Sequence, residues 1–156
     1  MRRSLSPVSG LLLLVLLSAG RFVADATPLS ADMIVSVPDQ VLALVDRGKL
    51  IARYSISTPK FGTGDSASSY RTPLGTPFVS AKIGDRLPPG TVIKNRIPTG
   101  EIVAVDTPGR DPIVSRVIWL RGMEAQNQKA RDRCIYIHGT PEERRIGKPA
   151  DRKSVV

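Results

Sequence analysis

The stretch VLALVDRGKLIARYSIS, residues 41–57, decides the fold. Two runs rich in Val, Ile and Leu, residues 41–46 and 50–57, flank the tetrapeptide Asp46-Arg47-Gly48-Lys49. Aliphatic and β-branched runs bounded by turn residues are typical of strands. Gly48 can adopt the positive φ that a tight turn demands. The stretch therefore predicts a β-hairpin.

Similar segments recur along the rest of the chain. Strand-like runs cover residues 34–37, 78–83, 101–105, 116–120 and 134–138. Residues 58–75, rich in Gly, Ser, Thr and Pro, predict a long surface loop, and one short helix is expected over residues 123–131. Several short strands separated by Pro and Gly turns, with almost no helix, predict a mainly β fold, an antiparallel β-sandwich or barrel.

The N-terminal residues predict an export signal. The pair Arg2-Arg3 is positive, residues 11–17 are apolar, and Ala24-Asp25-Ala26 is a small-residue cleavage site. We expect residues 1–26 to be a signal peptide and residues 27–34 to lead into the mature domain. The competing interpretation is an uncleaved anchor helix, but the apolar run is well short of the roughly 20 residues that a bilayer span needs. The expected location is the periplasm or cell envelope, with no membrane span after cleavage.

Composition restricts the classes of partner. A chain of 156 residues has room for one domain, and a monomer is the default expectation. The 23 Lys and Arg exceed the 14 Asp and Glu, for a net charge of +9, and such a surplus suits nucleic acid, anionic lipid or an acidic polymer. No run of basic residues with interleaved aromatics is present, so we expect no nucleic-acid partner. Cys134 is the one cysteine, and packing within a strand is favoured over a catalytic role.

His138 is the one histidine of the chain and ends an apolar strand-like run, directly before Gly139. A ring at a strand end can face a cleft while the strand fixes its backbone, as a general base requires. Taken alone, such a histidine is more often a packing or surface residue. It has no His or Cys partner at metal-ligand spacing, so no metal site is expected.

This histidine lies within one motif, a second motif follows it and a third precedes it. Ile135-Tyr136-Ile137-His138-Gly139-Thr140 is followed by Ile146-Gly147-Lys148-Pro149-Ala150, and Arg71-Thr72-Pro73-Leu74-Gly75-Thr76-Pro77 lies upstream. In this order they resemble the His-Gly, Ile-Gly-x-Pro-x and Thr-Pro-x-Gly segments of the L,D-transpeptidase catalytic domain family. The hairpin that begins near Asp39 is similar to the first strand pair of that family. The similarity runs from about Val35 to Ala150.

The resemblance implies a Cys/His acyl-transfer mechanism on peptidoglycan stem peptides, without a metal or organic cofactor. His138 would be the base that activates a cysteine thiol, and the backbone carbonyl of Gly139 would orient the imidazole. Tyr70 and Arg71, in the loop over residues 58–75, are the candidates for holding substrate. A simple solvated loop is the alternative for that segment.

The sequence departs from the family pattern after Ala150. The family has a Ser-His-Gly-Cys or similar tetrad there, followed by an Arg, whereas residues 151–156 are Asp-Arg-Lys-Ser-Val-Val. Ser154 occupies the place expected for the cysteine and is a poor substitute. We therefore expect a partial domain over residues 35–150, incomplete at its C-terminus, and a non-matching tail. Two alternatives to an enzyme remain: a non-catalytic peptidoglycan-binding module, and a truncated gene product without function.

Overall fold

The computed structural model describes residues 31–151. The expected signal peptide and Ser154 lie outside the described residues. Within them the elements, in order, are β1 (Ala31–Ser36), β2 (Val41–Asp46), β3 (Lys49–Ser55), β4 (Pro77–Ile83), β5 (Thr91–Lys94), β6 (Ile97–Ile102), β7 (Val114–Gly122), β8 (Tyr136–Gly139) and the 3₁₀ helix η1 (Glu143–Arg145). Strand β1 thus begins inside the range that was expected to lead into the domain.

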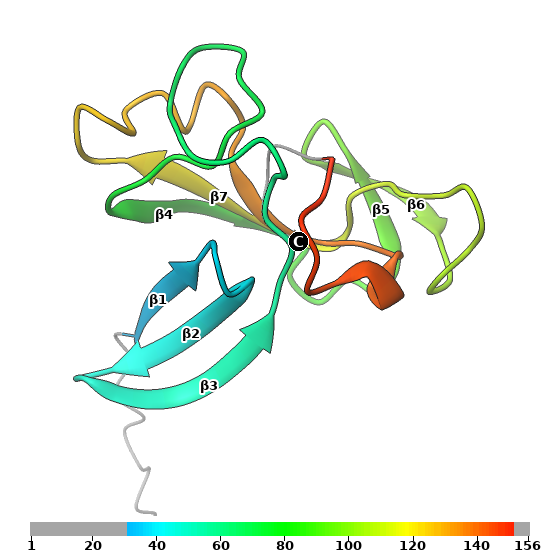
Figure 1. The fold of residues 1–156 in the computed structure, drawn as a ribbon. Coiled ribbons are helices and arrows are strands. Elements are labelled where there is room, and N and C mark those ends of the chain that lie inside the picture. The colour runs from blue at the N-terminus through cyan, green and yellow to red at the C-terminus, as the bar shows by residue number, and fades with distance from the viewer. Residues whose placement is uncertain (1–30, 152–156) are drawn as a thin grey trace, which may run out of the picture.

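The first three strands form one antiparallel sheet in the order β1-β2-β3 (Figure 1). β2 and β3 are joined by the predicted hairpin, in which Asp46 lies opposite Lys49. Arg47 and Gly48 have φ values of 48° and 77°. Two consecutive residues with positive φ give the two-residue turn whose twist matches that of the strands. The hairpin prediction is confirmed.

The other five strands form a second antiparallel sheet, built around β7. Strand β7 pairs with β4, β5 and β8, and β5 pairs in addition with β6. The chain turns between β5 and β6 at Asn95 and Arg96, which have φ values of 51° and 67°. Together with the first sheet, this arrangement confirms the predicted mainly β, antiparallel fold.

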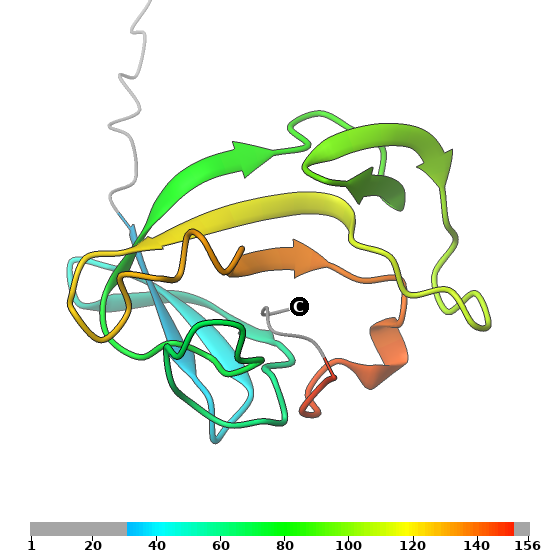
Figure 2. The same ribbon diagram turned by 90° about the horizontal axis from the view of Figure 1, so that it is seen from above.

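The two sheets meet at Ile137 of β8. Ile137 packs against Leu42 and Ile56 of the first sheet region and also against the cluster of Leu120 and Ile135 in the second. Because successive side chains of a strand point to opposite faces, Tyr136 and His138 lie on the other face of β8. Figure 2 shows β8 beside β7, above the first three strands. One strand therefore supplies both a core residue and the candidate base.

The helix expected over residues 123–131 is wrong, because that segment is a series of turns. Asn127 is 1% exposed, and its side chain accepts from the backbone N–H of Glu124 and donates to the carbonyl of Leu74. An asparagine side chain that bonds nearby backbone groups competes with helical hydrogen bonds.

Across residues 31–151 no helix is long and apolar enough to cross a membrane.

Three strand predictions also need correction. β5 was not predicted, and the run expected over residues 101–105 begins earlier, as β6 at Ile97. Pro98 had suggested a break, but β6 is an edge strand, where a missing N–H is tolerated. Cys134 does not belong to a strand, since its φ is 55° and β8 begins at Tyr136.

We predict that Ile135→Ala lowers the free energy of unfolding by about 3 kcal/mol, because its side chain fills the core between the sheets and the truncation leaves a cavity. Ile135 is 2% exposed, whereas Ile97 is 66% exposed and provides a matched control. Urea unfolding followed by circular dichroism measures both variants. Equal effects of Ile135→Ala and Ile97→Ala would contradict this description of the core.

Candidate active site

His138 lies at the end of β8, opposite Val117 of β7, and is 6% exposed. Its Nδ1 lies 2.9 Å from the carbonyl oxygen of Gly139. A carbonyl oxygen can only accept, so Nδ1 must carry the proton of this hydrogen bond. In the neutral ring Nε2 is then left with a lone pair, which is the arrangement of a general base.

A β-bulge in β7 shapes the backbone beside this histidine. The register of β7 and β8 shifts between Val114 and Val117, and Ser115 has a φ of 66°. Gly139 lies opposite Val114, and a Cβ atom on Gly139 would come within 2.6 Å of the Val114 carbonyl oxygen. Only a glycine fits this close approach of two backbones. Bulges are common beside active sites, where they redirect strands.

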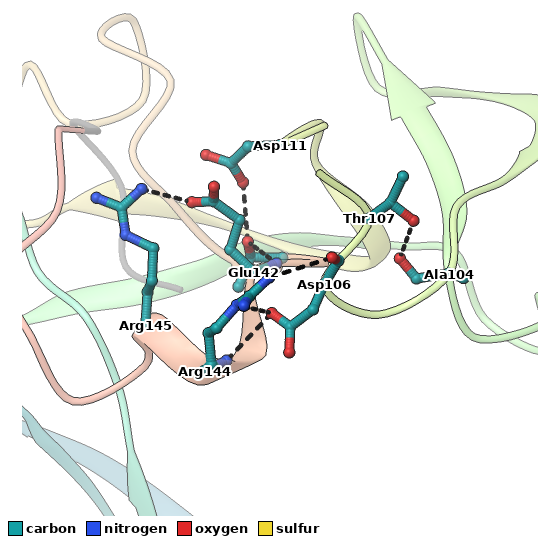
Figure 3. Close-up of polar contacts among 8 residues, drawn as sticks. Ala104, Asp106, Thr107, Asp111, Glu142, Arg144 and Arg145 are labelled. Atoms are coloured by element: carbon teal, nitrogen blue, oxygen red, sulfur yellow. Dashed lines mark hydrogen bonds and ion pairs between the residues drawn. The ribbon is translucent and has the colours of Figure 1, made fainter. Parts of the chain in front are cut away.

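A polar network follows directly after the strand end (Figure 3). The hydroxyl of Thr140 donates to Asp111 at 2.9 Å and accepts from the backbone N–H of Glu142 at 3.1 Å. Glu142 in turn forms an ion pair with Arg145 at 3.0 Å. These links fix the turn that follows His138, because they join it to the loop that carries Asp111, to its own backbone and to η1.

The loop that carries Asp111 is held on the same segment by further contacts. The backbone N–H of Asp106 donates to the carbonyl of Pro141 at 2.6 Å. The carboxylate of Asp106 forms an ion pair with Arg144 at 3.2 Å. Arg144 also donates a hydrogen bond to the backbone carbonyl of Asp106 at 3.3 Å. Two loops distant in the sequence thus meet at the strand end, as Figure 3 shows.

A small open pocket of about 180 Å³ lies beside this network. Its walls are formed by Ser57, Asp111, Thr140, Glu142, Arg145, Ile146, Lys148, Pro149, Ala150 and Asp151. The walls carry both carboxylates and cationic groups, so they can meet the charged ends of a peptide. His138 is not among the lining residues, although Thr140 two residues later is.

The segment that carries the Ile-Gly-x-Pro-x motif is anchored beside the end of β3. The backbone N–H of Gly147 donates to the carbonyl of Ile56 at 3.1 Å, and that of Ala150 donates to Thr58 at 2.8 Å. Thr58 is itself held by the buried side chain of Gln40, whose Oε1 accepts from the Thr58 N–H at 2.7 Å. The motif therefore forms one wall of the pocket and is fixed to the first sheet region.

The predicted substrate residues Tyr70 and Arg71 belong to a different part of the surface. Tyr70 is 56% exposed and its ring lies 5.7 Å from that of Phe61. It lines a second open pocket together with Lys129 and Arg133. Neither Tyr70 nor Arg71 lines the pocket beside Thr140. Their role in substrate binding stays a prediction.

A buried ion pair, which the sequence did not reveal, holds the loop over residues 58–75. Arg133 and Asp65 are 2.6 Å apart, with side chains only 5% and 8% exposed. Arg133 also donates to the carbonyls of Gly64, Ser69 and Arg71. One guanidinium thus organises the loop, because its planar fork of donors satisfies several acceptors at once.

Cys134 packs against the cluster of Ile93, Val117 and Tyr136. Its Sγ lies 3.8 Å from Arg96 Nη1 and 3.8 Å from the carbonyl of Asp132. Burial raises the pKa of the neighbouring Tyr136 above its ordinary value, as does the hydrogen bond with Cys134, while Arg96 acts in the opposite direction. The thiol is thus packed among these side chains.

Within residues 31–151 no group of three or more His, Cys, Asp or Glu could hold a metal ion.

Comparison with protein-family models gives a match over residues 30–154 to the L,D-transpeptidase catalytic domain. The chain belongs to this family. Neither the curated proteins nor the solved structures gave a significant match. The family agrees with the two antiparallel sheets described above. It also agrees with the resemblance carried by the His-Gly and Ile-Gly-x-Pro-x segments.

We predict that the neutral imidazole of His138 is the Nδ1–H tautomer. The chain holds one histidine, so ¹⁵N NMR of the imidazole nitrogens gives one unambiguous pair of signals. The hydrogen bond to the Gly139 carbonyl requires the proton on Nδ1. A spectrum at high pH that shows the Nε2–H tautomer would contradict the orientation described here.

We predict that Asp65→Asn lowers the free energy of unfolding by about 3 kcal/mol, because it leaves the buried Arg133 charge without its partner. Asp85→Asn is the matched control. Asp85 pairs with Arg86, but both side chains are almost fully exposed, so this change should leave the urea midpoint nearly unaltered. Similar midpoints for the two variants would show that the buried pair does not organise the fold.

Proposed function

We propose that the domain provides the general-base half of an L,D-transpeptidase active site, with His138 as the base and Gly139 as the residue that orients it. The hydrogen bond of 2.9 Å between Nδ1 and the Gly139 carbonyl is the observation that carries this proposal. It leaves Nε2 able to accept a proton. The substrate class implied by the family is the stem peptide of peptidoglycan.

In the reaction of the family, Nε2 takes the proton of a cysteine thiol and the thiolate attacks a peptide carbonyl carbon. As the C–N bond breaks, the imidazolium returns that proton to the departing amine, and a thioester acyl-enzyme remains. An acceptor amine then loses a proton to Nε2 and attacks the thioester, which releases the thiol. Both halves of this cycle need a base held in one tautomer.

The 156 residues themselves do not supply the thiol for this reaction. Cys134 is the one cysteine, and its Sγ lies among Arg96, Tyr136 and the Asp132 carbonyl. The family position for the nucleophile holds Ser154, which is outside the described residues. We therefore propose that this chain alone does not catalyse transfer.

A non-catalytic peptide-binding module is the second candidate. The mixed charges of the pocket beside Thr140 favour it, because Arg145 and Lys148 can meet a carboxylate while Asp111 can meet an amine. Tyr70 and Arg71, on a different part of the surface, would provide a separate contact from the loop over residues 58–75. Export to the cell envelope, from the signal over residues 1–26, would bring either form of the protein to peptidoglycan.

We predict that the pure chain, incubated with a synthetic stem tetrapeptide and an acceptor amine, forms neither a covalent adduct nor a transfer product. Intact-mass spectrometry detects an acyl adduct, and chromatography detects the new peptide bond. Cys134→Ala should behave like the unaltered chain. Transfer by the unaltered chain, lost in Cys134→Ala or Ser154→Ala, would identify the nucleophile and overturn the expected inactivity.

We predict that the same tetrapeptide shifts the imidazole signals of His138, because the proposed site surrounds the end of β8. Lys148→Gln should raise the dissociation constant about fivefold, as expected for the loss of one charge-assisted contact. Arg86→Gln, which removes an exposed cation, is the control with equal net charge. Unchanged imidazole signals at saturating peptide would contradict both the catalytic and the binding proposals for this site.

A further inference from the structure

The first sheet has an outer face, opposite to the face that packs in the core. Met33, Val35 and Leu42 pack together on the core side. Because successive side chains of a strand point to opposite faces, the residues that alternate with these three, and their partners on β3, point outward. The outward residues are Asp32, Ile34 and Ser36 of β1, Val41, Ala43 and Val45 of β2, and Leu50, Arg53 and Ser55 of β3. They are called the outer sheet face below.

The middle of the outer sheet face is apolar. All three outward side chains of the central strand β2 are aliphatic. Ala43 lies opposite Ile34, which is 56% exposed, and Val45 lies opposite Leu50, which is 54% exposed. An antiparallel sheet with one face in water normally carries polar side chains on that face. An apolar stripe on the side away from the core is typical of a contact surface.

Two charged side chains of opposite sign flank this apolar stripe. Asp32 belongs to β1 and lies in the same row of paired residues as Val45, whereas Arg53 belongs to β3 and lies in the row of Ala43. Within residues 31–151 neither of the two charged groups forms an ion pair. The outer sheet face thus has no net charge, although the chain as a whole carries +9. Two copies can therefore meet at this face without the repulsion of their basic surfaces.

The pattern is self-complementary about a two-fold axis that runs along β2 between two facing sheets. Such an axis places β1 of one copy over β3 of the second copy, and β2 over β2. Asp32 of one copy then lies one row away from Arg53 of the second copy, about 7 Å along the strands. An arginine side chain is long enough to close this gap. The two-fold axis repeats the contact, so each dimer contains two such ion pairs.

We propose that the outer sheet face is the interface of a symmetric homodimer. A second copy of this chain fits the face because it brings an equal apolar stripe to the middle and the opposite charge to each flank. An apolar centre with a charged rim is the usual anatomy of a protein interface. Sheets that pack face to face keep their strands within about 30° of each other, which agrees with an axis along β2. An anionic polymer does not fit, because the face is apolar and has no net charge.

The size of the outer sheet face predicts a reversible dimer. Its strands have six, six and seven residues, which gives a face about 20 Å long and 14 Å wide. Stable interfaces bury about 800 Å² per partner, and a face of this size lies at or below that value. None of its residues lines the pocket beside Thr140. The inference therefore does not rest on the proposed function.

Sedimentation velocity of the full chain over a series of concentrations tests the proposal. We expect a monomer–dimer equilibrium with no larger species, because a two-fold interface is closed. Ala43→Arg places a charge in the apolar stripe and should weaken dimerisation about tenfold or more. Ala67→Arg, at an exposed loop position, adds the same charge away from the face and is the matched control. Both positions are outside the core, and circular dichroism checks that both variants keep the fold.

An exchange of charges tests the two-fold contact itself. Arg53→Glu alone and Asp32→Arg alone should each weaken dimerisation about tenfold, because like charges then meet across the interface. When the two variant chains are mixed in equal amounts, every contact again joins opposite charges. The mixture should therefore form a heterodimer about as tightly as the unaltered chain forms its homodimer. The chain that carries both substitutions should also recover dimerisation.

Three outcomes would overturn the proposal. A chain that stays monomeric up to its solubility limit would show that no second copy binds the outer sheet face. Association that Ala43→Arg does not weaken would place the contact elsewhere, for example at the apolar residues 11–17. Failure of the two charge-exchanged chains to associate when mixed would exclude the pairing of Asp32 with Arg53. None of these results bears on the peptide-binding test above, which reads the signals of His138.

Discussion

The antiparallel pairing of β8 with β7 is the constraint on which the rest of the structure depends. Because β8 is a strand, this pairing directs its successive side chains to opposite faces, one toward the core between the sheets and the other away from it. Ile137 joins the cores of the two sheets, and its neighbour His138 points to the opposite face. Displacing β8 by one residue would exchange these environments, turning the imidazole into the core between the sheets and the isoleucine to the opposite face. The pairing that packs Ile137 into the core therefore also orients the candidate base.

Sequence reasoning succeeded where one residue sets the local conformation and failed where distant contacts set it. The hairpin at Gly48 follows from a turn that its own residues specify. The turns over residues 123–131 could not be predicted, because they depend on the buried amide of Asn127 bonding to Leu74, far away in the sequence. Strand β6 was misplaced because Pro98 is tolerated only through the edge position of that strand.

The candidate site shows the same division. The family resemblance implied the contact between the Gly139 carbonyl and His138, and the structure has it between these adjacent residues. The polar network and the buried pair left no signal in the sequence. Asp111 precedes Thr140 by 29 residues and Asp65 precedes Arg133 by 68. Such pairs are brought together only by the fold, and an aspartate or arginine that will be buried looks like any other charged residue beforehand.

Cys134 is close to His138 in the sequence, but the structure does not place its thiol where His138 could activate it. An unbroken strand through residues 134–138 would place Cys134 and His138 on one face, but about 13 Å apart, too far for direct proton transfer. The positive φ of Cys134 ends the strand pattern before Tyr136, and its Sγ lies against Arg96 instead. A thiol that His138 is to activate must therefore approach from another segment. In the family pattern the cysteine segment follows the Ile-Gly-x-Pro-x motif, which here forms a wall of the pocket beside Thr140 and is anchored at Thr58.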